Sequence, residues 1–186
     1  RRLSKSTMKR LADCLGWTWY HVIPIRRATA RSNLAMALGY DHRQSRTTIL
    51  AMYRHLALSI LELFRYGTPR GEPVPLRVEG QVHLDAAIAQ GRGVLVVTAH
   101  LGNWEVLLRY GAGLSRPVKI VTRHLSVSLF QKIWAYLRTG GPGLLSASNA
   151  ASSMVNGLKA GEIIGMVLDQ HAPETSAIPV PFFCHP

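Results

Sequence analysis

The first third of the chain carries apolar residues at the three- and four-residue spacing of amphipathic helices. This spacing predicts helices over residues 5–19 and 25–38, the second of which ends at a glycine. The longest apolar series predicts a helix over residues 45–66, with Ser45 as its N-cap. The pattern therefore predicts an N-terminal helical region over residues 1–67.

The pattern changes after a Gly- and Pro-rich break at residues 67–75. Short apolar runs now alternate with helical windows, and the run at 94–98 is β-branched and uncharged, as expected of a buried strand. This alternation predicts an α/β fold over residues 76–186, with a layered, largely parallel sheet flanked by helices. The expected strands are 76–78, 94–98, 118–122, 144–145 and 163–168, and the expected helices are 82–90, 103–110, 127–137 and 150–159.

His100 follows the strand predicted at 94–98, and sites in α/β sheets gather at the carboxyl ends of strands. Glu105 comes five positions later, which on one continuous helix would place the two side chains about 140° apart. They can therefore meet only if His100 lies in a turn before the helix, and Gly102 and Asn103 favour such a turn. A carboxylate beside an imidazole fixes its tautomer, so that the ring can take a proton from an alcohol. For an isolated pair, a buried histidine bonded to a carbonyl group is the alternative.

The charge balance narrows the class of partner. The 186 residues include 22 Lys and Arg against 10 Asp and Glu, a formal net charge of +12, and such a surface attracts polyanions. Nucleic acid, anionic lipid head groups and acidic carrier proteins all fit. Nucleic acid is not expected, because the chain has no recognised nucleic-acid motif and its aromatic residues are not interleaved with the basic ones.

Several other chemistries are not expected. The two cysteines are far apart and the eight histidines are scattered, so neither a metal nor a disulfide framework is expected. No Walker A or Gly-x-Ser-x-Gly motif is present, so neither a cofactor nor a serine acyl-enzyme is expected. The chain has no run of 18 apolar residues, which predicts no transmembrane helix within it. It begins at Arg1 and stops at Pro186, which suggests a fragment of a longer protein.

The residues around His100 resemble a known family. The block AHLGNWE, which includes His100 and Glu105, is similar to the signature of the lipid A late acyltransferases, or lauroyl/myristoyl acyltransferases. That family lies within the broader glycerolipid acyltransferases with a His-x4-acid motif. Residues 165–183 resemble the family's strand that ends in Asp-Gln and is followed by Val-Pro-Phe-Phe. Arg138 and the segment 31–34 are weaker matches.

The resemblance implies a glycerolipid acyltransferase-like fold and transfer of a fatty acyl group from acyl carrier protein to a hydroxyl of a lipid A precursor. It implies His100 as general base and Glu105 as the residue that orients it. By comparison with the family, the chain lacks an N-terminal anchor and the last third. For Arg123 and Arg138 a solvated surface position is the alternative, and for Asp169 a structural loop anchor. The residues implied to shape the site or contact substrate are Asn103, Arg123, Arg138, Asp169 and Gln170.

The same resemblance places the enzyme at the cytoplasmic face of the bacterial inner membrane, in lipopolysaccharide biosynthesis. Acyl carrier protein, a phosphorylated lipid acceptor and an anionic membrane surface would all complement the net charge of +12. Two alternatives stay open. The acceptor could be a phosphatidylinositol mannoside, an ornithine lipid or an aryl polyene, or the chain could be a non-catalytic basic module that binds anions or membranes.

Overall fold

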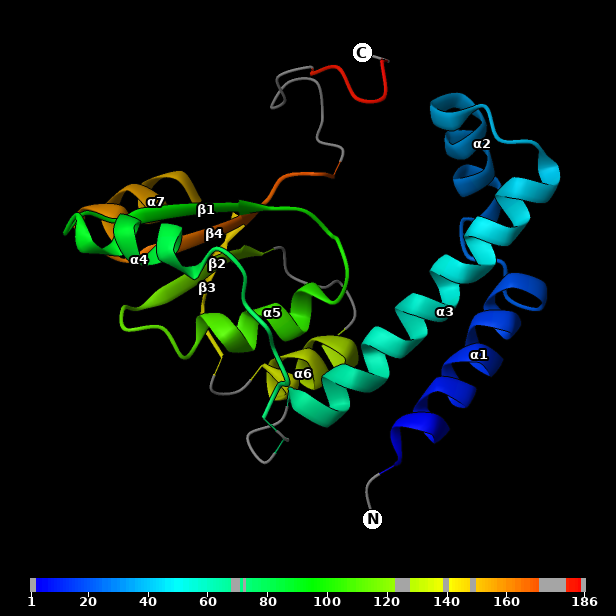
Figure 1. Cartoon of the computed structure of the whole chain (residues 1–186), viewed down its shortest axis with the longest axis horizontal. Helices are drawn as coiled ribbons and strands as arrows, with labels where there is room; N and C mark the ends of the chain where they lie inside the picture. The colour runs from blue at the N-terminus through cyan, green and yellow to red at the C-terminus, as the bar shows by residue number, and fades with distance from the viewer. Residues whose placement is uncertain are drawn as a thin grey trace. The chain divides into compact units, whose positions relative to one another are not determined.

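The structure is a computed structural model, and spatial contacts divide the chain into two compact units. The first unit comprises residues 1–61 and 171–186, and the second comprises residues 62–170. The residues that the structure describes are 3–67, 71, 73–122, 128–138, 141–147, 150–170 and 180–184. Their elements, in chain order, are α1 (Lys5–His21), α2 (Arg27–Leu38), α3 (His42–Tyr66), α4 (Gln81–Ala89), β1 (Val94–Thr98), α5 (Trp104–Gly111), β2 (Val118–Thr122), α6 (Ser128–Leu137), β3 (Gly143–Ser146), α7 (Ala150–Lys159) and β4 (Ile163–Val167) (Figure 1).

The first unit is built from α1, α2 and most of α3. Its core contains Tyr20, Ile49 and Tyr53, which are at most 5% exposed. The helices α1 and α3 approach closely at Gly16, where an added Cβ would lie 2.6 Å from the backbone nitrogen of Arg54. The apolar periodicity matches burial only in part: Ile49 and Tyr53 are buried, whereas Leu11, Leu15 and Met52 of the same series are 37–40% exposed.

The N-terminus of α3 differs from the prediction. Asp41 and Gln44 form reciprocal caps, in which the Asp41 N–H donates to Gln44 Oε1 at 2.9 Å and the Gln44 N–H donates to Asp41 Oδ1 at 2.7 Å. This capping box starts the helix at His42, so the prediction of Ser45 as N-cap was wrong. Ser45 instead lies inside the helix and is fully buried.

Helix α3 also changes the expectation about membrane segments. It is 25 residues long, and an 18-residue window within it reaches a mean hydropathy of 1.2. By length and composition it could cross a membrane, although the chain lacks an unbroken apolar run. Core helices of soluble proteins pass the same two criteria, so α3 is a candidate only.

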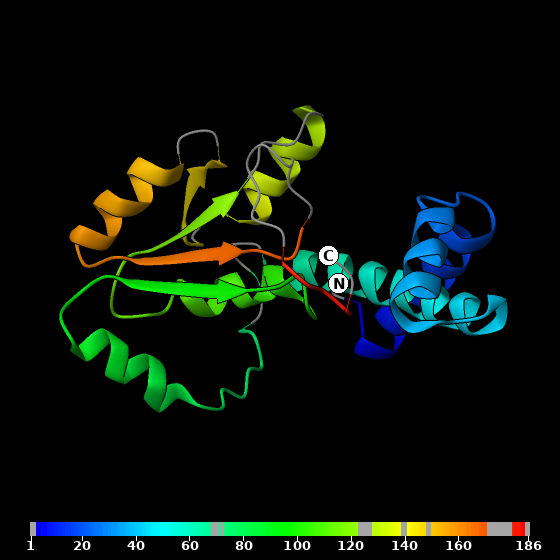
Figure 2. The same ribbon diagram turned by 90° about the horizontal axis from the view of Figure 1, so that it is seen from above.

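The second unit contains a four-stranded sheet in the order β1-β4-β2-β3, and every pairing among the described strands is parallel. Figure 2 shows β4 between β1 and β2. The central position of β4 explains why Ile163 and Ile164 are at most 1% exposed. The predicted α/β fold with a parallel sheet and flanking helices is confirmed.

Two details of the strand predictions were wrong. The strand β1 is not buried: Leu95 and Val97 are 48% and 58% exposed, because among the described strands β1 lies at the edge of the sheet, next to β4 alone. Residues 76–78 are described and lie outside any strand. The Leu76 N–H donates to the Val74 carbonyl at 2.9 Å, so a local turn uses the group that a sheet ladder would need.

The register of β1 and β4 positions the site. Thr98 lies opposite Val167, and beyond this pair the Leu168 N–H donates to the Thr98 carbonyl at 3.1 Å. His100 and Asp169 each follow two residues after these paired positions. Parallel pairing thus brings two segments that are distant in the sequence to one edge of the sheet.

The approach of β1 to α7 generates a prediction. An added Cβ at Gly93 would lie 2.3 Å from the Leu158 carbonyl oxygen and 2.4 Å from its Cα, so the backbone itself would have to move. We expect Gly93→Ala to lower the free energy of unfolding by roughly 1–3 kcal/mol or more, measured by urea denaturation. Gly113→Ala is the matched control, because its Cβ would meet its nearest neighbour at 3.5 Å. Equal stability of the two variants would contradict this packing.

Candidate active site

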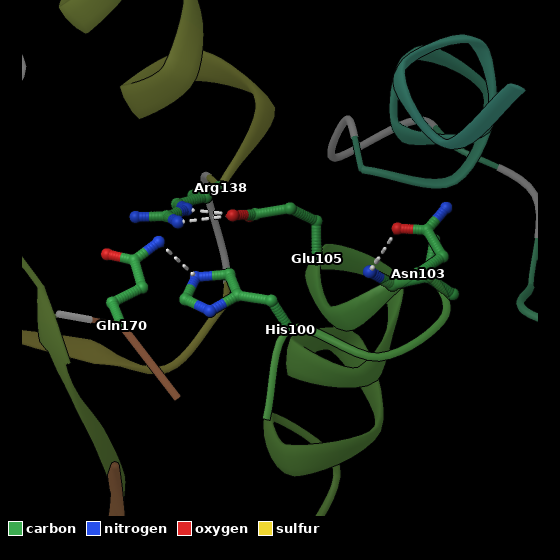
Figure 3. Close-up of polar contacts among 6 residues, drawn as sticks. His100, Asn103, Glu105, Arg138 and Gln170 are labelled. Carbon is green, nitrogen blue, oxygen red and sulfur yellow. Dashed lines mark hydrogen bonds and ion pairs between the residues drawn. The ribbon is translucent and has the colours of Figure 1, made fainter. Parts of the chain in front are cut away.

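The His100 side chain lies between two residues that follow β4. Its Nδ1 is 2.7 Å from Asp169 Oδ1, and its backbone N–H donates to Asp169 Oδ2 at 2.8 Å. On the other side of the ring, Nε2 is 3.3 Å from Gln170 Nε2 (Figure 3). The His100 and Asp169 side chains are 29% and 33% exposed, so the pair is accessible to a substrate but partly shielded from water.

The partners of the ring define its tautomer. Burial by itself would raise the pKa of the Asp169 carboxyl, but hydrogen bonds from the side chain and backbone of His100 outweigh it and lower that pKa below 3.8. Asp169 is therefore a carboxylate at neutral pH and can only accept, so the shared proton lies on Nδ1. The lone pair of the neutral ring then lies on Nε2, where the Gln170 amide donates to it. An imidazole in this state can accept a proton from an alcohol.

The turn that carries His100 has the form that its sequence predicts. Gly102 has a φ of +62°, in the left-handed region that favours glycine. Asn103 has non-helical dihedrals and is the N-cap of α5, with its Oδ1 accepting from the Val106 N–H at 3.3 Å. The helix begins at Trp104, so the prediction that His100 precedes it is confirmed.

Glu105 does not have the geometry that was predicted for it. Its two oxygens accept from Arg138, at 2.9 Å from Nε and 2.5 Å from Nη2, and Figure 3 shows the carboxylate directed at the guanidinium. Among the described residues, the carboxylate bonded to the His100 imidazole belongs to Asp169. The predicted direct contact between Glu105 and His100 is therefore not found in the part of the chain that the structure describes, and Asp169 makes the carboxylate contact with the ring instead. The physical reason is that Arg138 offers a two-point match to the Glu105 carboxylate.

The Glu105–Arg138 ion pair joins α5 to the end of α6. The two side chains are only 7% and 16% exposed, and the guanidinium also lies 5.7 Å from the centroid of the Trp134 ring. Arg138 is thus not on the solvated surface. It holds together the helix that follows His100 and the helix that follows β2.

The remaining predicted site residues differ in position. Gln170 lies against His100, and Asn103 uses its side chain to cap α5 and to donate to Glu62 at 2.7 Å. Arg123 lies outside the described residues. The sequence did not predict a place for Glu62 in the site. It is one acidic residue within a long apolar helix, and no motif marked it as a site residue.

The imidazole also contacts an aromatic ring. The His100 and Trp104 rings meet edge to face, with centroids 4.9 Å apart at 78°. Leu101 and Leu168, which adjoin the histidine and the aspartate in sequence, are 84% and 57% exposed. The residues next to the His100–Asp169 pair in the sequence thus expose apolar surface.

A comparison with protein families shows which family the chain belongs to. The family model for the bacterial lipid A biosynthesis acyltransferases matches residues 1–186, which is the whole chain. The chain belongs to this family. No curated protein matched the chain in a separate sequence comparison. This member of the family is therefore an acyltransferase in lipid A biosynthesis, and its substrates include a lipid.

The buried ion pair of this acyltransferase generates a prediction about stability. Glu105→Ala would leave the Arg138 guanidinium buried and unpaired, which should cost about 3–5 kcal/mol of unfolding free energy. The measurement is urea denaturation followed by circular dichroism. The matched control is Glu79→Ala, which removes the same side chain from an exposed ion pair with Arg77 and should change stability very little. A loss at Glu105 no larger than that at Glu79 would refute the structural role of the pair.

Proposed function

We propose that this enzyme transfers a fatty acyl group from the thioester of acyl carrier protein to a hydroxyl of a lipid A precursor, with His100 as general base. The proposal rests chiefly on one observation: Asp169 accepts both the ring N–H and the backbone N–H of His100, which leaves Nε2 with its lone pair. Family membership supplies the reaction class and the lipid substrate.

In the proposed step, the acceptor hydroxyl donates its proton to His100 Nε2 as its oxygen attacks the thioester carbonyl carbon. The new ester C–O bond forms through a tetrahedral intermediate, and the C–S bond breaks. The thiolate of the carrier then takes the proton from Nε2, so the reaction produces an acylated lipid and a free thiol. Asp169 stabilises the imidazolium that exists between the two proton transfers.

The other predicted residues act around this step. Gln170 donates to the Nε2 lone pair that the acceptor hydroxyl must reach, so its amide has to give way to the hydroxyl and would then lie beside it. Asn103 and Arg138 support the turn and α5, and Arg138 is neutralised by Glu105 rather than free to bind a phosphate. For Arg123, a contact with the sugar phosphates stays a prediction from the family resemblance.

The proposed partners follow from charge. A net charge of +12 complements an acidic carrier protein and the phosphates of the acceptor. The same charge would hold the protein on the anionic cytoplasmic face of the inner membrane, which is the location that we propose. Other lipid acceptors are the alternative, and product analysis separates them from a lipid A precursor.

The first experiment tests donor, acceptor and base together. The full-length protein is incubated with acyl carrier proteins of several acyl chain lengths and with lipid A precursors, and product masses are recorded. We expect acylated lipid A precursor from the wild type, and a loss of roughly 10²–10⁴-fold in turnover for His100→Ala with the fold retained. Near-wild-type turnover in that variant would exclude His100 as the base. Products formed only on other lipids would reassign the acceptor.

A second substitution tests the partner of the base. Asp169→Asn keeps the shape of the side chain but places an amide N–H where Nδ1 now donates, which favours the tautomer without a lone pair on Nε2. We expect a loss in kcat of about 10⁴-fold, with the thermal midpoint changed much less. Asp85→Asn makes the same chemical change on an exposed helix and should leave kcat unaltered. Equal kcat in the two variants would remove Asp169 from the mechanism.

A further inference from the structure

We propose that Glu62, on α3, is a positioning residue that fixes the catalytic turn through Asn103. This proposal rests on the proposed function, because it concerns the base that the turn carries. Asn103 Nδ2 donates to Glu62 Oε2 at 2.7 Å in a partly buried contact. A hydrogen bond to a carboxylate is stronger than one between neutral groups, and a half-buried carboxylate within an apolar helix needs such a partner.

The contact selects the orientation of the Asn103 amide. Glu62 can only accept, so it attracts the amide nitrogen and leaves Oδ1 to accept from the Val106 N–H. With the amide reversed, the NH2 group of Asn103 would face the N–H of Val106. Two donors would then oppose each other, and the cap would be lost. The negative charge of Glu62 beside the start of α5 also complements the partial positive charge of that helix end.

The position of the cap matters for the base. Asn103 determines that α5 begins at Trp104, whose ring meets the His100 ring edge to face. It also places Glu105 in the first turn, where it pairs with Arg138. A change in the cap would therefore reach the imidazole through Trp104, and it would also disturb the ion pair that holds α5.

Glu62 is itself held in place by the end of α3. The Tyr66 carbonyl accepts from Arg109 Nε at 3.2 Å, which ties α3 to α5. At Gly67, an added Cβ would lie 2.8 Å from the Leu137 carbonyl oxygen, so the chain there is in close contact with the end of α6. The segment from Glu62 to Gly67 is thus a fixed support for the turn, contributed by a helix that lies far from His100 in the sequence.

The test compares Glu62→Ala, Glu62→Gln, Asn103→Ala and the double variant Glu62→Ala/Asn103→Ala in the full-length protein. A displacement of about 1 Å can cost 10²-fold in rate, so we expect kcat of Glu62→Ala to fall by roughly 10- to 100-fold. The KM for acyl carrier protein should change less than twofold. Glu62→Gln, which still accepts from the Asn103 amide, should recover most of kcat. The double variant should be no slower than the slower single variant, because Asn103→Ala already removes the contact through which Glu62 acts.

Glu79→Ala is the control, since Glu79 is exposed and forms its ion pair with Arg77, which is also exposed. A Glu62→Ala variant with unchanged kcat would overturn the proposal, and so would additive losses in the double variant. A loss confined to KM would make Glu62 a binding residue instead, which also contradicts the positioning role.

Hydrogen exchange provides a readout that does not depend on acyl transfer. We expect the backbone amides of residues 104–107 to exchange faster in Glu62→Ala than in wild type, and at nearly the wild-type rate in Glu62→Gln. Faster exchange in a protein that fails to use acyl carrier protein would sustain the role of Glu62 and reject the donor that we propose. Unchanged exchange would reject the role of Glu62 whatever the activity.

Discussion

The candidate site depends on the bidentate contact between Asp169 and His100. One carboxylate accepts from both the ring and the backbone of the same residue, so it fixes the rotation of the imidazole and the position of the turn together. Either contact alone would leave one of these free. The ionised state of Asp169, maintained by the same hydrogen bonds, is what makes the arrangement directional and leaves Nε2 as the accepting atom.

Two further acidic residues fix the helices around the site in the same way, by accepting hydrogen bonds. Glu105 holds Arg138, and Glu62 holds Asn103. Each contact joins α5 to a different helix, so the element that follows the catalytic turn is fixed from two sides. The chain is strongly basic and has few carboxylates. Those in the site each have a partner that leaves them little freedom to move, and they therefore fix the positions of the residues around His100.

The sequence predicted most elements because their signals are local. The period of the apolar residues located the helices, and β-branched runs located β1, β2 and β4. Its errors arose where long-range contacts decide the outcome. The composition of β1 indicates a buried strand, but its edge position in the strand order exposes Leu95 and Val97. Ser45 has the chemistry of an N-cap, but the reciprocal pair Asp41 and Gln44 starts the helix earlier.

The sequence by itself determined the α/β class, the turn that places His100 before a helix, and the family to which the residues around it belong. Only the tertiary structure decided which carboxylate serves the histidine. Glu105 is near His100 along the chain, but a helix directs its side chain to Arg138. Asp169 is 69 residues away from His100 in the sequence and reaches it because β1 and β4 are parallel neighbours. Strand pairing is a long-range property, and the local pattern of residues does not specify it.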